Sequence, residues 1–391
     1  MALIVQKYGG SSLASPKHIQ IAADRIKNLR LSGAEVVVVV SAMGHTTDHL
    51  LKLASKTVKS PPSRELDMLL TAGERVSMSL LAMSLQERKV PAISFTGSQS
   101  GIMTTSDHSQ AKILEIRPQR IQEELQKGKV VIIAGFQGVS LEKEITTLGR
   151  GGSDTTAVAL AAALKAERCE ILTDVDGIFS ADPRLVSKAR LFESLSYDEC
   201  LELASLGAKM QPRSIELAKR FQVKVWIGPS HNNLGRGTKV GFEDKETEME
   251  KSSIKGIATK EGFHYFSTPV DLKSLASFFK ETGFNLRFVS LGAGRTNFLC
   301  EESQAFDVRE FLKKSRLDFI EHEKVAIVSV VGEGLSNSKE LLPKCLSILS
   351  SLGAQNLLLT SNTLSLTVAV PLEFKTQLTQ VLHQEMIEKG L

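Results

Sequence analysis

The sequence predicts an α/β fold, in which a mainly parallel sheet lies between layers of helices and two small α+β modules follow it. Two observations carry this prediction. Strand and helix patterns alternate through the first 230 residues, which favours a parallel sheet whose connections are helices. Beyond residue 252, a strand–helix–strand–strand pattern occurs twice, which indicates a pair of related modules.

The expected strands of the first part are short apolar runs without polar alternation, as in strands buried on both faces. They are Ala2–Lys7, Glu35–Ser41, Lys129–Ala134, Cys169–Thr173 and Val223–Ile227. A helix is expected over Pro16–Leu31, where apolar residues recur at helical spacing after Ser15. Further helices are expected over Leu66–Arg88, Pro118–Gln126 and Asp154–Leu164.

The chain changes in character from Pro229 to Ser252, where turn-forming and charged residues predominate. We therefore expect a first domain over 1–228, a linker over 229–252, and modules over 253–323 and 324–391 that can interleave. The first module should contain strand-like pieces in Ile254–Ser267, a helix over Leu272–Thr282, and strands over Asn285–Ser290 and Asn297–Cys300. The second should contain a strand over Val325–Val331, a helix over Lys339–Leu352, and strands over Asn356–Thr360 and Leu364–Val370.

Composition excludes several classes of function. Hydrophobic residues make up 42% of the chain, charged residues 24%, and the formal net charge is +4, so nothing indicates a nucleic-acid partner. The longest apolar run, Val36–Val40, is too short to span a membrane, and no signal peptide is recognisable. We expect a cytoplasmic protein whose four widely spaced cysteines are reduced. His45 and His49 have helical i,i+4 spacing but lack the rest of a zinc motif, so no metal site is expected.

Polar segments follow three of the expected strands, beginning at Lys7, Ser41 and Thr173. Parallel sheets bind their ligands at this carboxyl edge. In Lys7-Tyr-Gly-Gly-Ser-Ser, the glycines let the backbone approach a ligand and the lysine brings a positive charge, as phosphoryl transfer requires. The glycine-rich run Thr146–Leu164 enters a helix and also suggests an anion site, but it lacks the ending of a P-loop.

Seven segments occur in an order that resembles the aspartokinases of the amino acid kinase family. They are KYGGSS, VVVVVSAMGHTTD, TAGERVSMSLL, IAGFQG, TTLGRGGSDTTAVALAAAL, TDVDGIFSADPR and YDECLELASLGAK, within residues 2–228. The two C-terminal modules resemble, more loosely, the tandem ACT domains of that family, which have a ferredoxin-like fold. The resemblance implies transfer of the ATP γ-phosphate to the side-chain carboxylate of L-aspartate, giving 4-phospho-L-aspartate. It implies ATP and Mg²⁺ as cofactors and the first step of lysine, threonine and methionine biosynthesis through diaminopimelate.

The resemblance also implies residue roles on the acceptor side. Lys7 and Asp154 would be catalytic, with Lys7 neutralising the transferring phosphate and Asp154 contacting the substrate amine or that lysine. Aspartate would be held by Ser41, Thr47, Glu74, Arg150 and Ser153, with Glu74 near the α-amino group and Arg150 on the α-carboxylate. Other interpretations remain open: Glu74 as a solvated helix acid, and Ser153 or Asp154 as a helix cap.

On the nucleotide side, the resemblance implies a second set of residues. These are Lys7, Gly9, Gly10 and Ser11 after the first strand, then Thr173, Asp174, Phe179, Asp182 and Arg184, and finally Lys209. Phe179 could equally serve in core packing. Two departures from the family pattern affect this set, because Asp176 replaces a proline and the segment Gly207–Arg213 is one residue shorter and lacks a histidine.

Departures in the ACT modules concern regulation. Ser267–Leu272 and Gly332–Lys339 lack the usual Pro-Gly turn, Thr360–Thr363 replaces a common Ser-Thr-Ser-Glu, and Arg287 stands where an acid is usual. An arginine would repel the amine of an effector, so we hypothesise weak or absent feedback by lysine or threonine, with the modules retained for homodimerisation. Two further hypotheses are a kinase for glutamate or acetylglutamate and a non-catalytic amino-acid sensor.

Overall fold

The computed structural model describes residues 2–231, 235–242, 253–283, 287–292 and 294–390, apart from the side chains of Ser253 and Arg287. The chain forms two compact units. The first contains residues 1–178, 191–201 and 210–245, and the second contains residues 179–190, 202–209 and 246–391. In the described part of the chain, no helix has the length and apolar character that crossing a membrane requires.

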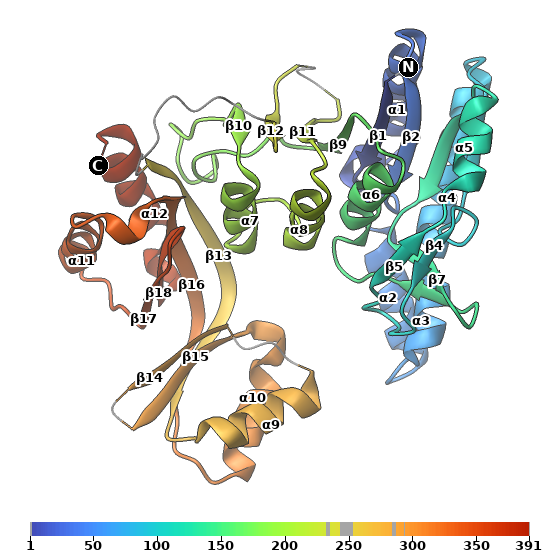
Figure 1. The fold of residues 1–391 in the computed structure, drawn as a ribbon. Coiled ribbons are helices and arrows are strands. Elements are labelled where there is room, and N and C mark those ends of the chain that lie inside the picture. Colours follow the sequence, from blue (N-terminus) through green and yellow to red (C-terminus); the bar gives the residue numbers. More distant parts are fainter. Residues whose placement is uncertain (1, 232–234, 243–252, 284–286, 293, 391) are drawn as a thin grey trace. The chain divides into compact units, whose positions relative to one another are not determined.

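An eight-stranded sheet forms the centre of the first unit (Figure 1), in the order β10-β12-β11-β9-β1-β2-β6-β3. Its strands are β1 (Leu3–Tyr8), β2 (Glu35–Val40), β3 (Ala92–Phe95), β6 (Val130–Ala134), β9 (Arg168–Thr173), β10 (Ser194–Leu195), β11 (Val225–Pro229) and β12 (Thr238–Val240). Every pairing is parallel except that of β11 with β12. The mainly parallel sheet predicted from the alternating pattern is therefore confirmed.

Helices cover both faces of this sheet, as its uninterrupted apolar strands require. The apolar sides of α1 (Pro16–Leu31) and α4 (Ala72–Glu87) share one buried cluster with alternate residues of β1, β2 and β6. On the strands, Val5, Val37 and Val39 are also fully buried, and the alanine-rich α6 (Gly152–Ala163) packs against β1, β2 and β9. Because α6 is buried on nearly all sides, it fixes the residues of its first turn rigidly.

The remaining α-helices of the first unit have at most 12 residues. They are α2 (Thr46–Thr57), α3 (Ser63–Leu70), α5 (Gln119–Gln126), α8 (Pro212–Phe221) and the start of α7 (Tyr197–Ser205). A second sheet, which sequence patterns do not predict, has the order β5-β4-β7-β8. Its strands are β4 (Ile102–Thr104), β5 (Ile113–Ile116), β7 (Gln137–Ser140) and β8 (Ile145–Thr147).

The second unit contains one six-stranded antiparallel sheet, ordered β14-β15-β13-β16-β18-β17 (Figure 1). Two strand–helix–strand–strand–helix repeats build it. The first comprises β13 (Ser253–Thr268), α9 (Leu272–Thr282), β14 (Arg287–Gly292), β15 (Arg295–Glu301) and α10 (Glu302–Lys314), and the second comprises β16 (Ile320–Glu333), α11 (Leu341–Ser351), β17 (Leu358–Ser361), β18 (Ser365–Pro371) and α12 (Lys375–His383). One buried apolar cluster lies within the first repeat and another lies mainly within the second, so the two predicted α+β modules are confirmed.

Several predicted boundaries differ from the structure. The helix expected over Leu66–Arg88 is divided at Thr71 into α3 and α4. The expected linker contains β12, whose three residues become a strand by pairing with β11 and β10. The expected boundary between residues 323 and 324 lies within β16, because β13 and β16 pair along their lengths and join both modules in one sheet. Residues 285 and 286 of one expected strand lie outside the described residues.

The four cysteines are buried and free, as expected for reduced thiols. Burial raises the pKa of Cys200 and Cys300 to about 12 and that of Cys345 to about 11. It also raises the pKa of Cys169. Thiols that remain protonated in this way are poor nucleophiles, so the cysteines serve in packing.

Candidate active site

The three polar segments predicted at the carboxyl edge of the sheet meet there. The backbone N–H of Gly9, after β1, donates to the carbonyl of Leu172 near the end of β9, at 3.3 Å. The carbonyl of Gly10 accepts from Gly44 N, after β2, at 3.0 Å. A Cβ atom on Gly10 would lie only 2.9 Å from Ala42 O, so this close approach requires glycine.

Lys7 and Asp154 form an ion pair at this edge. Nζ of Lys7, near the end of β1, lies 2.6 Å from Oδ1 of Asp154 in the first turn of α6, and the two side chains are 12% and 13% exposed. Gly151 is the N-cap residue of α6 and no side chain caps the helix, so neither Ser153 nor Asp154 has the capping role considered above. Asp154 therefore directs its carboxylate at the lysine.

Glu74 occupies a buried position beside the segment that follows β2. The residue is only 4% exposed, and its Oε1 accepts a hydrogen bond from Ala42 N at 3.1 Å. Among the described residues, Oε2 has no hydrogen-bond partner. Burial raises the pKa of Glu74 to about 7 against the opposing effect of backbone hydrogen bonds. The interpretation of Glu74 as a solvated helix acid is therefore wrong.

The start of α4 is fitted closely to this segment. A Cβ atom on Gly73 would lie 2.8 Å from Cβ of Ala42, and Ser77 Oγ donates to Ser41 O at 2.7 Å. These contacts place Ser41 and Glu74 on adjoining backbone. Thr47 lies in the first turn of α2, half-buried, five residues after Ala42.

Arg150 lies in the turn that precedes α6, between two glycines with positive φ, Gly149 at 75° and Gly151 at 73°. Its side chain is exposed and lines a pocket of about 370 Å³, whose other lining residues are Ser109, Gln110, Lys112, Leu148, Gly149 and Arg213. Ser153, by contrast, is buried, and its side chain would meet any Cβ atom on Gly135 at 2.9 Å. The turn thus separates an exposed guanidinium from a buried hydroxyl.

The predicted nucleotide residues are divided between the two units. Thr173 ends β9 in the first unit, and its hydroxyl donates to the carboxylate of Asp174 at 2.9 Å. Phe179, Asp182, Arg184 and Lys209 belong to the second unit. There the Asp182 carboxylate forms an ion pair with Arg184 at 2.6 Å, which lowers its pKa, while Phe179 is half-buried.

Sequence reasoning missed two charged residues that hold the segments next to the turn of Arg150. Asp67 of α3 is completely buried and accepts hydrogen bonds from Ser109 N at 3.1 Å and Thr147 Oγ1 at 2.6 Å. Arg213 of α8 donates to Leu148 O at 2.9 Å and to Ala111 O at 3.0 Å. In the sequence, Asp67 could have been recognised as an acidic residue on the apolar face of a predicted helix.

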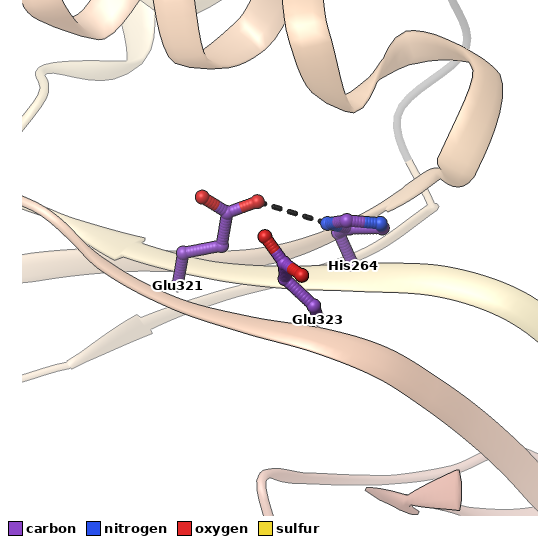
Figure 2. A group of neighbouring side chains, drawn as sticks. All are labelled: His264, Glu321 and Glu323. Atoms are coloured by element: carbon purple, nitrogen blue, oxygen red, sulfur yellow. Dashed lines mark hydrogen bonds and ion pairs between the residues drawn. The ribbon is translucent and has the colours of Figure 1, made fainter.

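One group in the second unit has the residue types of a metal site. Figure 2 shows His264 of β13 beside Glu321 and Glu323 of β16, with His264 Nδ1 2.9 Å from Oε1 of Glu321. However, the Arg309 guanidinium donates to both carboxylate oxygens of Glu321, at 2.8 and 2.7 Å. Burial alone would raise the pKa of Glu321, but hydrogen bonds from Arg309 and His264 hold it below its usual range. Because Arg309 already balances this charge, we interpret the group as an ion-pair cluster.

Comparison with known proteins places this chain in a family. The model of the amino acid kinase family matches residues 2–229. The chain is 39% identical to the aspartokinase of Corynebacterium glutamicum over 98% of this chain and 96% of that one. It is 42% identical to aspartokinase 2 of Bacillus subtilis over 90% of this chain and 89% of that one.

Solved structures agree in fold. The structure of Escherichia coli aspartokinase III in complex with aspartate and ADP covers 98% of this chain and 99% of its own, at 23% identity and a TM-score of 0.83. Aspartate kinase from Synechocystis is 33% identical over 98% of this chain and 69% of its own, with a TM-score of 0.58. The chain belongs to the amino acid kinase family. Within that family it belongs to the aspartokinases, which makes it an ATP-dependent kinase.

Proposed function

We propose that the protein transfers the γ-phosphate of ATP to the side-chain carboxylate of L-aspartate, giving 4-phospho-L-aspartate and ADP. The observation that carries this proposal is the Lys7–Asp154 ion pair, which directs a lysine ammonium to the ligand-binding edge of the sheet. The acceptor carboxylate is already ionised near neutral pH, since its ordinary pKa is about 4, so the reaction needs no general base. What it needs is screening of two anions that must approach each other, and Lys7 supplies it.

The acceptor would be held by both its α-amino group and its α-carboxylate. Glu74 offers the unpartnered Oε2 to the α-amino group, and binding of an ammonium there favours the ionised carboxylate. The exposed guanidinium of Arg150 takes the α-carboxylate. Ser41, Thr47 and Ser153 complete the acceptor side in this proposal. Because both α-groups are recognised, the arrangement favours a free amino acid over an acylated one.

The residues present fit a bound nucleotide. A Cβ atom on Gly9 would lie 3.4 Å from Nζ of Lys7, so glycine at this position leaves space for phosphate oxygens beside the ammonium. We propose that Gly9, Gly10 and Ser11 contact the phosphates and that Thr173, Asp174, Phe179, Asp182, Arg184 and Lys209 hold the rest of the nucleotide. Bound Mg²⁺ would neutralise charge on the phosphates. Among the described residues of the first unit, no carboxylate cluster offers a dedicated site, so the phosphates themselves would be its main ligands.

We further propose that the enzyme works in the cytoplasm, catalyses the first step of lysine, threonine and methionine biosynthesis through diaminopimelate, and forms a homodimer through its ACT modules. Lysine or threonine is the proposed class of effector at these modules, with weak or absent feedback. Arg287, on which that hypothesis depends, begins β14, but its side chain lies outside what the structure describes.

A hydroxamate assay tests the proposed reaction, because hydroxylamine traps an acyl phosphate. The purified protein should form hydroxamate with ATP and aspartate and much less with glutamate or acetylglutamate. Preference for glutamate or acetylglutamate would mean that the preferred acid, and not aspartate, is the phosphate acceptor. Absence of ATP-dependent product with all three would favour the non-catalytic sensor.

A further inference from the structure

Arg213 joins two backbone segments of the first unit. Its Nη1 donates to the carbonyl of Leu148 and its Nη2 to the carbonyl of Ala111, at 2.9 and 3.0 Å. Leu148 directly precedes the Gly149–Arg150–Gly151 turn, and Ala111 lies between the pocket residues Gln110 and Lys112. The planar guanidinium fork can satisfy two carbonyls at once, which a lysine ammonium on its flexible stem does far less well.

The pocket beside this fork is built for an anion. Its charged lining residues are Lys112, Arg150 and Arg213, and no carboxylate is among its lining residues. Arg213 forms no ion pair within the described residues, and burial lowers its pKa. Within the described residues none of these three side chains forms an ion pair, although the Glu216 carboxylate acts on Arg213, and three cations in a pocket of about 370 Å³ match a small carboxylate ligand.

The same two segments are fixed from a second side by Asp67. Its carboxylate accepts from Ser109 N and from Thr147 N, each at 3.1 Å. On the α8 side, a Cβ atom on Gly151 would collide with Gln211, which lies two residues before Arg213. The turn that carries Arg150 is therefore enclosed by a buried acid and by the first turn of α8. Of Asp67, Gln211 and Arg213, only Arg213 is among the residues that line the pocket.

We propose that Arg213 is a positioning residue for the acceptor: it holds the turn so that the Arg150 guanidinium meets the α-carboxylate of aspartate. This inference rests on the proposed role of Arg150. Arg213 then determines specificity through Arg150, and its loss weakens binding of acceptors that carry a free α-carboxylate.

Steady-state kinetics of Arg213→Met, Arg213→Lys and Arg150→Met, and of the double variant Arg213→Met/Arg150→Met, test the proposal. Arg213→Met should raise KM for aspartate about tenfold, the size expected for a disturbed charge-assisted hydrogen bond, and leave KM for ATP within about twofold. Arg213→Lys should not restore the wild-type KM, because the charge alone does not bridge two carbonyls. In the Arg150→Met background, Arg213→Met should add almost nothing.

A second acceptor and a matched variant separate positioning from a general structural effect. With the α-amide of aspartate, which has no α-carboxylate, Arg213→Met should change KM little. Arg88→Met is the control for a general structural effect, because Arg88 joins α4 to α1 by donating to Gln20 O and by an ion pair with Asp24. It should lower the melting temperature comparably without altering KM for aspartate.

Three results would overturn the inference. Full additivity in the double variant would mean that Arg213 acts independently of Arg150. A parallel rise of both KM values, matched by Arg88→Met, would mean a purely structural role. If Arg150→Met itself left KM for aspartate unchanged in an active enzyme, the proposed role of Arg150 would fail first, and the Arg213 inference with it.

Discussion

The ammonium of Lys7 lies 2.6 Å from the carboxylate of Asp154, and this ion pair joins the end of β1 to the first turn of α6. The two residues are 147 positions apart in the sequence, and both emerge from elements whose other residues are mostly buried. An ion pair held on both sides by rigid elements restricts the lysine to one direction. The lysine is thereby oriented before either substrate arrives, which is the arrangement that stabilises a transition state most effectively.

Replacing Lys7 by alanine should lower kcat by about 10² to 10³-fold, as is typical when a key transition-state donor is removed. Asp154→Asn should also lower kcat, because an amide cannot hold the ammonium in an ion pair. Both can be measured by coupling ADP release to an optical assay, with circular dichroism to verify folding. Near-normal turnover of folded Lys7→Ala would contradict the assignment.

The pKa of Glu74, raised to about 7 by burial, should appear in the pH dependence of kcat/KM for aspartate. The ionised carboxylate is the form that binds an ammonium, so kcat/KM should rise with pH through about 7 and then level off. Glu74→Gln should have a lower kcat/KM without this rise. Titration of ATP is common to both proteins, so an identical pH profile in the variant would exclude Glu74 as the group responsible.

Stability should respond to the same group in the opposite sense. Since the folded-state pKa of about 7 exceeds the ordinary glutamate value of 4.5, the native state binds more protons than the unfolded state between these pH values. The free energy of unfolding should therefore fall as pH rises through this interval, by on the order of 3 kcal/mol. Chemical denaturation at pH 4.5 and 8 should show a smaller decrease for Glu74→Gln than for the wild type.

His383 should stabilise the segment of residues 179–190 in the second unit. Its ring is completely buried, with Nε2 2.9 Å from Ser180 Oγ, and that oxygen also accepts from Arg190 N at 2.9 Å. His383→Phe should cost about 1–3 kcal/mol of unfolding free energy, because it leaves buried polar atoms without a partner. Since Phe179 and Asp182 belong to this segment, we also expect a higher KM for ATP.

The matched control for His383 is Ser329→Ala, which removes another buried side-chain hydrogen bond of the second unit, 2.8 Å from Ser329 Oγ to Thr367 Oγ1. This variant should lose comparable stability and keep the wild-type KM for ATP. Equal effects of the two variants on KM would show that general destabilisation, rather than the anchoring of residues 179–190, is responsible.

Feedback by lysine or threonine should be weak, because Arg287 stands where the family places an acid. Isothermal titration calorimetry of the full chain with each amino acid should show no binding at micromolar concentrations. Adding lysine or threonine at the same concentrations should leave the rate of hydroxamate formation unchanged. A dissociation constant in the micromolar range for either amino acid would overturn the hypothesis.

Local signals in the sequence were sufficient for much of the secondary structure. The helices over Pro16–Leu31 and Leu272–Thr282 have the predicted bounds, because their caps lie in the sequence itself: Ser15 accepts from His18 N and Asp271 from Ser274 N. The division of α3 from α4 at Thr71 was missed because apolar spacing continues across it. The short strand β12 was missed because it exists only through pairing with distant strands.

The site shows the same division between local and distant information. Strand ends and glycines predicted the edge at which Lys7, Gly9 and Ser41 lie together. The burial of Glu74 and the clamp of Asp67 on Ser109 and Thr147 depend on segments far apart in the chain, so periodicity could not reveal them. Likewise, the assignment of residues 179–190 to the second unit depends on contacts such as Ser180 with His383, 203 positions apart.

That assignment bears on how such a protein can be divided or recombined. Ala181 and Val186 lie in the same buried cluster as Val328 and Leu378, although the chain enters and leaves their segment from the first unit. Cutting after residue 228 would leave those apolar side chains on a catalytic fragment without the second-unit residues that bury them. A regulatory region exchanged between relatives would therefore have to include the donor's residues 179–190 and 202–209 as well as its C-terminal part. A single crossover point cannot exchange these separate segments without also exchanging first-unit residues between them.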